Sequence, residues 1–322
     1  MTKTSTIAEM FGAADVTTFL GLPECRVSDL AARGARGAIL GVPGVTPYAS
    51  VGAYCAEAPA VIRRAIAGYA ANVAHVDFDS GAPIFSGPPN VFDCGDLPFD
   101  PDDFAANRTG VREAVTAMLA AGAVPILIGG DDSLPQPMLE AYAHHGPITI
   151  LQIDAHIDWR EEVQGETNGL SSGMRRASEM PHVERIIQVG MRGIGSARQG
   201  EVDDARAWGA HIIPARDVVR GGTAAASDLI PEGARVVVCL DVDGLDPAIM
   251  PAAIGRAPGG LGYWDVIELI EGAATRGRLA GFEVAEFFPP ADFDDQGALV
   301  AARIIANVVR LVAQSHIQGD AQ

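Results

Sequence analysis

Short apolar runs rich in Val, Ile and Leu alternate along this chain with stretches in which apolar residues recur every three or four positions. The first pattern is typical of strands buried on both faces, and the second is typical of helices. Strands are predicted at 37–42, 90–94, 124–128, 185–189, 211–213 and 279–286, and at the start of the segments 148–160 and 235–247. Helices are predicted at 59–69, 109–121, 137–143, 202–208, 263–275 and 296–313.

This alternation of strand and helix predicts the α/β class, with three αβα layers and a mostly parallel sheet of eight strands covered by helices on both faces. A chain of 322 residues that is 48% hydrophobic can bury one large core. We therefore expect a single domain over residues 1–322, with residues 1–35 as an N-terminal extension that packs on it. In such a fold, ligands bind at the carboxyl ends of the strands.

Two of the predicted strands end in acidic residues. ITILQIDAHID places Asp154, His156 and Asp158 at alternate positions, and RVVVCLDVDG does the same for Asp241 and Asp243. Alternate residues of a strand point to the same side. Carboxylates crowd together only where cations neutralise them, so the five side chains predict a cup for two divalent cations. Asp154 and Asp241 are the ligands that both ions are expected to share.

A single Asp after a strand has a simpler interpretation as a turn former or a helix cap. Finding two acidic clusters, both at the ends of buried strands, favours metal binding instead. LIGGDDS follows a third buried strand and supplies a further candidate ligand, Asp131 or Asp132.

The motifs DAHID and LDVDGLDP resemble the two metal motifs of the ureohydrolase family, which includes arginases and agmatinases. The similarity extends to TTFLGLPEC, GAILGVPGV, VFDCGDLPFDPDD, PGGLGYWDV and GFEVAEFFP, so it covers most of the chain. The resemblance implies an arginase-like fold and cleavage of a C–N bond in a small cationic guanidino compound, which releases urea or a urea derivative and an amine. It also implies two Mn²⁺ or Ni²⁺ ions and a homo- or hetero-oligomer, a trimer or hexamer.

The sequence departs from the family pattern in two places. The family has His where Asp132 stands, which makes Asp132 the preferred ligand over Asp131. With Asp132, the candidate metal ligands would include five carboxylates. The ion nearest Asp132 could then bind with altered geometry or a different metal preference, could bind through a water, or could be absent. Agmatinase-type members also carry a His where Leu170 stands. Asn168 and Ser171 are the residues expected to hydrogen-bond the substrate in that loop.

The resemblance assigns roles to two further carboxylates. Glu286 stands where the family has a Glu that contacts the guanidinium, and the forked acceptors of a carboxylate fit a planar cation. The alternative is a strand-end acid paired with an Arg. Asp158 is the predicted catalytic residue, which accepts a hydrogen bond from the activated water and passes a proton to the leaving amine.

The sequence defines the substrate less precisely than it defines the reaction. Agmatine is the default for a chain whose flanking segments look agmatinase-like, but the stretch GVTPYASVGAYCAEAPAVIR lacks the family pattern that accepts an amine tail. Tyr48, Tyr54 and Phe288 could wall a compact pocket instead. These departures favour an atypical guanidine, such as guanidinobutyrate, guanidine itself or a biguanide such as metformin. A rival hypothesis is a noncatalytic partner subunit of a hetero-oligomeric ureohydrolase.

Composition restricts the partners and the compartment. The net charge of −18 argues against nucleic acid as a partner. The four Cys residues are scattered, which indicates reduced thiols rather than a disulfide framework. The N-terminal residues lack a signal-peptide pattern, and no run is long enough to span a membrane. We therefore expect a cytoplasmic protein that contacts neither nucleic acid nor membrane.

Overall fold

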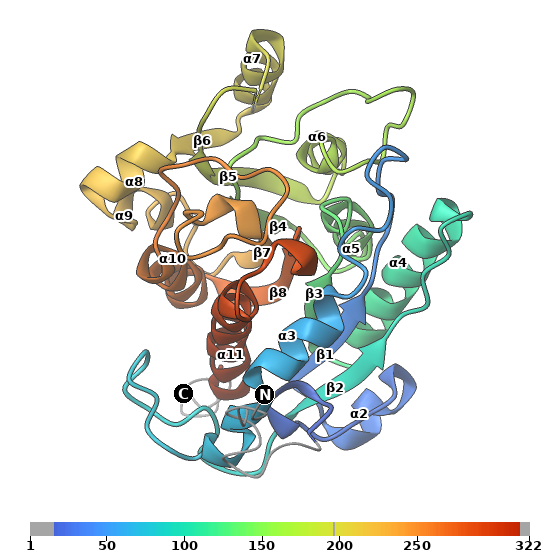
Figure 1. The fold of residues 1–322 in the computed structure, drawn as a ribbon, viewed down its shortest axis with the longest axis vertical. Helices are drawn as coiled ribbons and strands as arrows, with labels where there is room; N and C mark the ends of the chain where they lie inside the picture. Colours follow the sequence, from blue (N-terminus) through green and yellow to red (C-terminus); the bar gives the residue numbers. More distant parts are fainter. Residues whose placement is uncertain (1–15, 196, 316–322) are drawn as a thin grey trace, which may run out of the picture.

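The fold is built around one parallel sheet of eight strands (Figure 1). The computed structural model describes residues 16–195 and 197–315. The strands lie in the order β2-β1-β3-β8-β7-β4-β5-β6. Their bounds are Gly37–Val42 (β1), Val91–Asp96 (β2), Val124–Gly129 (β3), Ile148–Ile153 (β4), Val183–Met191 (β5), His211–Pro214 (β6), Arg235–Asp241 (β7) and Arg278–Ala285 (β8). The predicted α/β class is confirmed.

Helices cover both faces of the sheet. They are α2 (Leu30–Arg33), α3 (Ala58–Ile66), α4 (Phe104–Ala120), α5 (Pro135–Glu140), α6 (Gly173–Ser178), α7 (Gln199–Trp208), α8 (Ala215–Gly221), α9 (Ala224–Ser227), α10 (Tyr263–Arg276) and α11 (Gln296–Gln314). One core cluster joins the sheet to α3, α10 and α11, and a second joins its other face to α4, α5 and α6. The three layers of the prediction are therefore present.

Alternate residues of the central strands enter different cores. In β4, Leu151 and Ile153 belong to one cluster and Ile150 belongs to the other. All six residues of β4 are buried, as expected for a strand covered on both sides. The same burial leaves the strand ends as the place where polar side chains can gather.

Several helix bounds differ from the sequence prediction. Helix α4 begins at Phe104 rather than at 109, because the side chain of Asp103 accepts a hydrogen bond from the backbone N–H of Ala106 at 2.9 Å and caps the helix there. Helices α6, α8 and α9 are six, seven and four residues long. Such short helices carry too few apolar positions for their spacing to reveal them.

The segment before β1 packs on the domain. Phe19, Leu20 and Leu22 are buried, and the backbone N–H of Phe19 donates to Asp93 Oδ2 at 2.8 Å. The predicted extension spans residues 1–35, of which residues 1–15 lie outside the described part of the chain.

Helix α11 corrects one expectation from the sequence. The described residues contain one helix long and apolar enough to cross a membrane, and that helix is α11, with 19 residues and a mean hydropathy of 1.4. Within the fold 67% of this stretch is buried, and its apolar side chains pack against α3 and α10 in the core. Its hydrophobicity is therefore that of a core helix.

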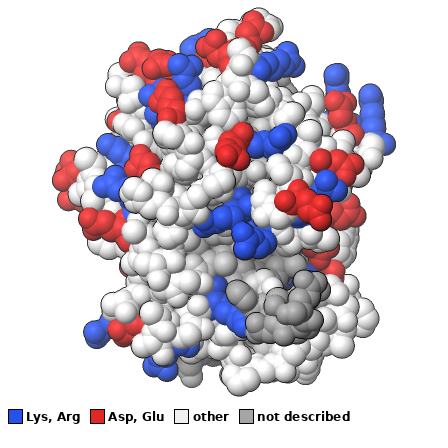
Figure 2. Space-filling model, turned by 180° about the vertical axis from the view of Figure 1, so that it is seen from behind, with Lys and Arg blue, Asp and Glu red and all other residues white. Residues whose placement is uncertain are grey.

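Charged side chains are spread over the surface. On the face drawn in Figure 2, acidic and basic side chains are intermixed and separated by uncharged residues. Among the described residues on this face, the basic side chains form no continuous track of the kind that binds a phosphate backbone. The predicted absence of a nucleic-acid partner stays a prediction.

Candidate metal centre

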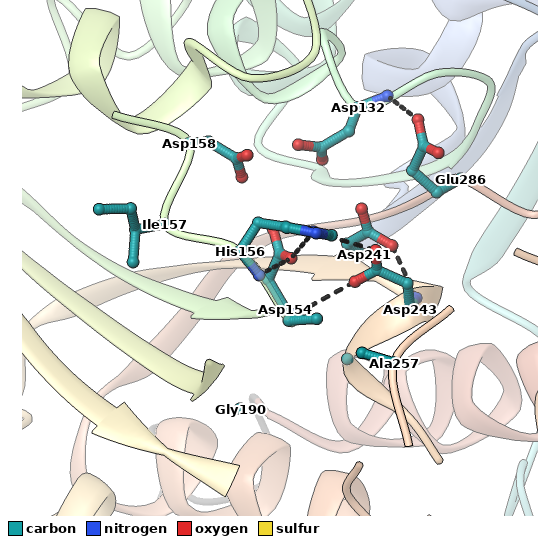
Figure 3. A network of polar contacts seen from close by, with 12 residues as sticks. Asp132, Asp154, His156, Ile157, Asp158, Gly190, Asp241, Asp243, Ala257 and Glu286 are labelled. Atoms are coloured by element: carbon teal, nitrogen blue, oxygen red, sulfur yellow. Dashed lines mark hydrogen bonds and ion pairs between the residues drawn. The ribbon is translucent and has the colours of Figure 1, made fainter. Parts of the chain in front are cut away.

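The predicted ligands meet at the carboxyl ends of neighbouring strands. Asp154 follows β4, Asp241 ends β7, and Asp243 lies in the short 3₁₀ helix after β7. Asp132 follows β3 and Glu286 follows β8. Figure 3 shows these side chains turned toward one shared space, with Asp158 on its far side.

Two groups of side chains in this space have the geometry to hold a metal ion. One consists of Asp154, His156 and Asp243, and the other of Asp132, Asp154 and Asp241; within each, the candidate ligand atoms lie within 4.8 Å of one another. Asp154 belongs to both groups, as expected for a ligand shared by two ions. Asp241 belongs to one group, and Asp158 lies outside both.

His156 is the basic partner of the cluster. Its Nδ1 lies 3.1 Å from a carboxylate oxygen of Asp243 and 3.4 Å from one of Asp154. Burial alone would lower the pKa of the imidazole, but these two carboxylates outweigh it and raise the pKa to about 11. A neutral imidazole is the form that binds a metal, so an ion there would replace this proton.

The other acids in the cluster lack comparable compensation. Burial first, and then the charges of neighbouring carboxylates, raise the pKa values of Asp132, Asp158, Asp241 and Asp243. Asp154 is the exception, because its hydrogen bonds with His156 and Asp158 lower its pKa despite burial. Buried carboxylates that repel one another are stabilised by bound cations. The donor set therefore fits divalent metal ions.

Hydrogen bonds from backbone N–H groups hold the carboxylates in position. Asp154 Oδ1 accepts from His156 N at 2.6 Å, and Asp241 Oδ1 accepts from Asp243 N at 2.7 Å. Asp243 Oδ1 in turn accepts from Ala155 N at 3.0 Å, which links the two metal motifs. The acids are thus fixed by the turns that follow their own strands.

Asp131 and Asp132 have different surroundings. The carboxylate of Asp131 accepts from the backbone N–H groups of Val45, at 2.8 Å, and Thr46, at 3.3 Å, and from the hydroxyl of Ser133. Those contacts tie two loops together. Asp132 instead lines the cavity that contains other candidate ligands. This position agrees with the choice of Asp132 over Asp131 as the metal ligand, which the family resemblance favoured.

Glu286 and Asp158 are held in strained backbone conformations. Their φ angles are 67° and 45°, a left-handed region that residues other than Gly seldom adopt. Glu286 Oε1 accepts from the N–H of Asp132 at 3.0 Å and from the hydroxyl of Tyr54. Burial nevertheless raises the pKa of Glu286 to about 8. A cationic group beside it would favour the ionised carboxylate.

The ligands open into a cavity of about 210 Å³. It is lined by Asp132, His156, Asp158, Trp159, Arg160, Leu170, Ser171, Gly195, Glu201, Asp241, Asp243, Ile254, Gly255 and Glu286. Asn168, predicted to bind substrate with Ser171, is absent from this lining; its side chain bonds with Gln136 and Glu166 instead. Tyr48, Tyr54 and Phe288 do not line the cavity either, and Tyr54 reaches it only through Glu286.

Sequence reasoning missed three supporting residues. Arg192 donates to the backbone carbonyls of Asp243 and Leu245 at 2.7 and 3.0 Å, so it holds the loop that carries a metal ligand. Gln152 and Gln188 lie in the sheet beneath the site. The signal for the two glutamines was present, because each is a polar residue inside an otherwise apolar strand.

Comparison with known proteins agrees with this geometry. A family model described as the arginase family matches residues 35–310. The chain belongs to the arginase family. Proclavaminate amidinohydrolase of Streptomyces clavuligerus is 30% identical over 233 residues, which cover 70% of this chain and 74% of that protein. N(1)-aminopropylagmatine ureohydrolase of Thermus thermophilus is 30% identical over 62% of this chain and 67% of that protein.

Solved structures of the arginase family share the fold. The structure of proclavaminate amidinohydrolase from Streptomyces clavuligerus has a TM-score of 0.80 at 26% identity, and the match covers 94% of this chain and 99% of that one. The predicted enzyme class, a hydrolase acting on amidine C–N bonds, is confirmed by the family. Arginase-family enzymes use a binuclear metal centre, and the two ligand groups that share Asp154 fit one.

Proposed function

We propose that this arginase-family hydrolase cleaves the guanidino C–N bond of a short, compact substrate, such as guanidine or a biguanide of the metformin type, at two Mn²⁺ or Ni²⁺ ions. The observation that carries the proposal is the pair of ligand groups that share Asp154 in one cavity with Glu286. The relatives named for proclavaminate and for aminopropylagmatine support a guanidino substrate class.

Asp132, Asp154, His156, Asp241 and Asp243 would hold the ions, with Asp158 beside them. When bound, two divalent cations supply the activation of water at neutral pH. Substrate binding and proton transfer are carried out by side chains that line the same cavity.

Glu286 binds and orients the substrate. Its carboxylate is fixed by Tyr54 and by the N–H of Asp132, so its position is set before a substrate arrives. A guanidinium placed against it gains charge-assisted hydrogen bonds. This contact would hold the guanidino carbon over the metal ligands.

Asp158 handles the proton. Gln152 already donates to Asp158 Oδ2 at 2.6 Å, so a proton taken from the attacking water would sit on Oδ1. A carboxylate at this position can accept a proton and then release it to the departing amine. Asp158 lines the cavity, and its backbone lies in the left-handed region.

The size and lining of the cavity favour a compact substrate. Trp159, Leu170 and Ile254 contribute apolar surface to the cavity lining. Two charged residues of the lining pair with each other, with Arg160 Nε 4.0 Å from Glu201 Oε1. Because the Glu201 carboxylate is paired with Arg160, small alkyl groups fit this cavity better than the extended ammonium tail of agmatine does.

The test is a substrate panel on the purified full chain. Agmatine, guanidinobutyrate, guanidine and metformin are incubated with the protein loaded with Mn²⁺ or with Ni²⁺, and the release of urea or a urea derivative and of ammonia or amine is measured. We expect turnover of guanidine or metformin to exceed turnover of agmatine. Absence of release from every compound, in protein that holds two ions, would contradict the hydrolase.

The same assay addresses the noncatalytic subunit. The observation that favours it is Asp132, which brings the number of buried carboxylates in the cluster to five, together with Asp154, Asp158, Asp241 and Asp243. If release requires a second, different chain, and the purified chain alone binds no stoichiometric metal, then it is a partner subunit of a hetero-oligomer. The size of the assembly, measured with and without that chain, distinguishes the two arrangements.

A further inference from the structure

Two buried glutamines form a pair directly beneath the candidate metal centre. Gln152 in β4 and Gln188 in β5 are partners in the register of the parallel sheet. Their side chains are 2% and 0% exposed. They share the sheet face to which Asp154 belongs, because alternate residues of β4 point the same way.

The amide of Gln152 bridges two carboxylates of the site. Its Nε2 donates to Asp154 Oδ2 at 2.7 Å and to Asp158 Oδ2 at 2.6 Å. Gln188 lies behind it, and its Nε2 donates to Gln152 Oε1 at 2.6 Å and to the carbonyl of Ile157 at 2.8 Å. The contacts therefore run from β5 through β4 to the two acids.

The chemistry of the acceptors determines which way both amides face. A carboxylate such as that of Asp154 and the backbone carbonyl of Ile157 can only accept hydrogen bonds. The nitrogen of Gln152 must then face the acids, which leaves its oxygen toward Gln188, and the nitrogen of Gln188 must face that oxygen. Each side chain thus fixes the orientation of the next.

Fold stability alone does not account for this pair. Gln188 Oε1 is buried without a hydrogen-bond partner among the described residues, and an unsatisfied polar atom in a core costs free energy. An apolar side chain of the same length would avoid that cost. The donors on Nε2 are what such a replacement would lose.

We infer that Gln152 is a positioning residue for the metal centre and that Gln188 braces it; this inference rests on the proposed function. Asp154 and Asp158 both place a carboxyl oxygen within hydrogen-bond distance of the same Gln152 nitrogen. One amide that donates to both holds them together and leaves their remaining lone pairs toward the cavity. Partners of this kind, which contact metal ligands but not the metal, typically change metal affinity 10- to 100-fold when they are lost.

The test compares Mn²⁺ binding by the full-length, metal-free protein and three variants. Gln152→Met keeps the length of the side chain and removes the donors. Gln188→Met removes only the brace. Thr149→Val is the matched control, since Thr149 is a buried polar residue on the opposite face of β4.

Mn²⁺ titration calorimetry and urea unfolding of the metal-free protein are measured together. We expect Gln152→Met to weaken Mn²⁺ binding about 10- to 100-fold, Gln188→Met to weaken it less, and Thr149→Val to leave it unchanged. The electron paramagnetic resonance signal of paired Mn²⁺ should diminish in the same order. If the two glutamines had a purely structural role, their substitution would lower the stability of the metal-free protein, and the Mn²⁺ affinities of the three variants would not follow this order.

The outcomes separate this inference from the proposed function. Wild-type protein that binds neither Mn²⁺ nor Ni²⁺ would overturn the proposed function. Wild-type protein that binds two Mn²⁺, with Gln152→Met and Gln188→Met binding as tightly, would overturn only the positioning role. If Gln152→Met does not fold, the affinity of Gln188→Met relative to Thr149→Val decides.

Discussion

At the scale of single residues, carboxyl groups with the same charge play different parts. Asp131 and Glu283 are buried like Asp132 and Glu286, but only the latter two line the cavity. Burial alone therefore does not identify a functional acid. What distinguishes Glu286 is a fixed carboxylate at the cavity wall, with its backbone in the left-handed region.

The two buried glutamates of the β8 segment give a matched comparison. We expect Glu286→Gln to lower kcat/KM for the guanidino substrate about 10- to 100-fold, because a neutral amide gives up the charge-assisted hydrogen bonds to the guanidinium. Glu283→Gln should leave kcat/KM near the wild-type value, since Glu283 is buried in β8 and does not line the cavity. Steady-state kinetics with metal-loaded protein measures both. Equal losses in the two variants would contradict the role of Glu286.

At the scale of elements, buried ion pairs join helices and loops to the sheet. Arg63 of α3 is 7% exposed. Its Nε and Nη2 donate to the two carboxylate oxygens of Asp93 in β2 at 2.8 and 2.9 Å, and its Nη1 lies 2.5 Å from Asp96. The sequence predicts α3 and β2 from their apolar spacing, but it does not show that these two elements are neighbours.

Removal of that buried cation tests the junction. Arg63→Met leaves Asp93 buried without its partner, so we expect the free energy of unfolding to fall by about 3–5 kcal/mol. Arg64→Met, at the exposed next position of α3, should change it by less than about 0.5 kcal/mol. Urea unfolding followed by circular dichroism gives both values. Similar stabilities for the two variants would show that the pair contributes little.

Asp79 ties the loop before β2 to α10 and α11, and its contribution depends on pH. Although burial opposes it, hydrogen bonds from Tyr263, at 2.5 Å, and Arg303, at 2.6 Å, lower the pKa of Asp79 below its usual 3.8. A carboxyl with a lowered pKa in the folded state stabilises the protein above the unfolded pKa and loses that effect as the pH falls through the folded value.

We therefore expect Asp79→Asn to lower the free energy of unfolding by about 1 kcal/mol at pH 7, with a gap to wild type that narrows as the pH falls below 3.8. Asp203→Asn removes an exposed acid and should show no such convergence. Urea unfolding across this pH range provides the measurement. A gap that stays constant down to the lowest pH would rule out the assigned titration.

A comparison of the predicted and observed helices shows which features apolar spacing cannot predict. The longest helices were predicted because their apolar spacing repeats over several turns. The start of α4 was missed because the cap at Asp103, rather than apolar spacing, sets it. Asn168 was predicted from its place in a loop, and only the fold shows that Gln136 and Glu166 hold its side chain.

At the scale of the whole molecule, the order of the strands creates the site. β3, β8, β7 and β4 are consecutive neighbours in the sheet, and each delivers an acid from its carboxyl end. The motifs at Asp154 and Asp241 could be predicted from local sequence, since each lies at the end of an apolar run. Their adjacency depends on strands far apart in the chain, and it was predicted from the general rule that acidic residues at the carboxyl ends of parallel strands gather at one edge of the sheet, with support from the family resemblance.

The measurement that tests the metal centre most directly is anomalous X-ray diffraction from crystals grown with excess Mn²⁺. Two anomalous peaks are expected in the cavity, one among Asp154, His156 and Asp243 and the other among Asp132, Asp154 and Asp241. Those side chains spread apart around solvent, with no anomalous peak between them, would contradict a binuclear centre in this chain.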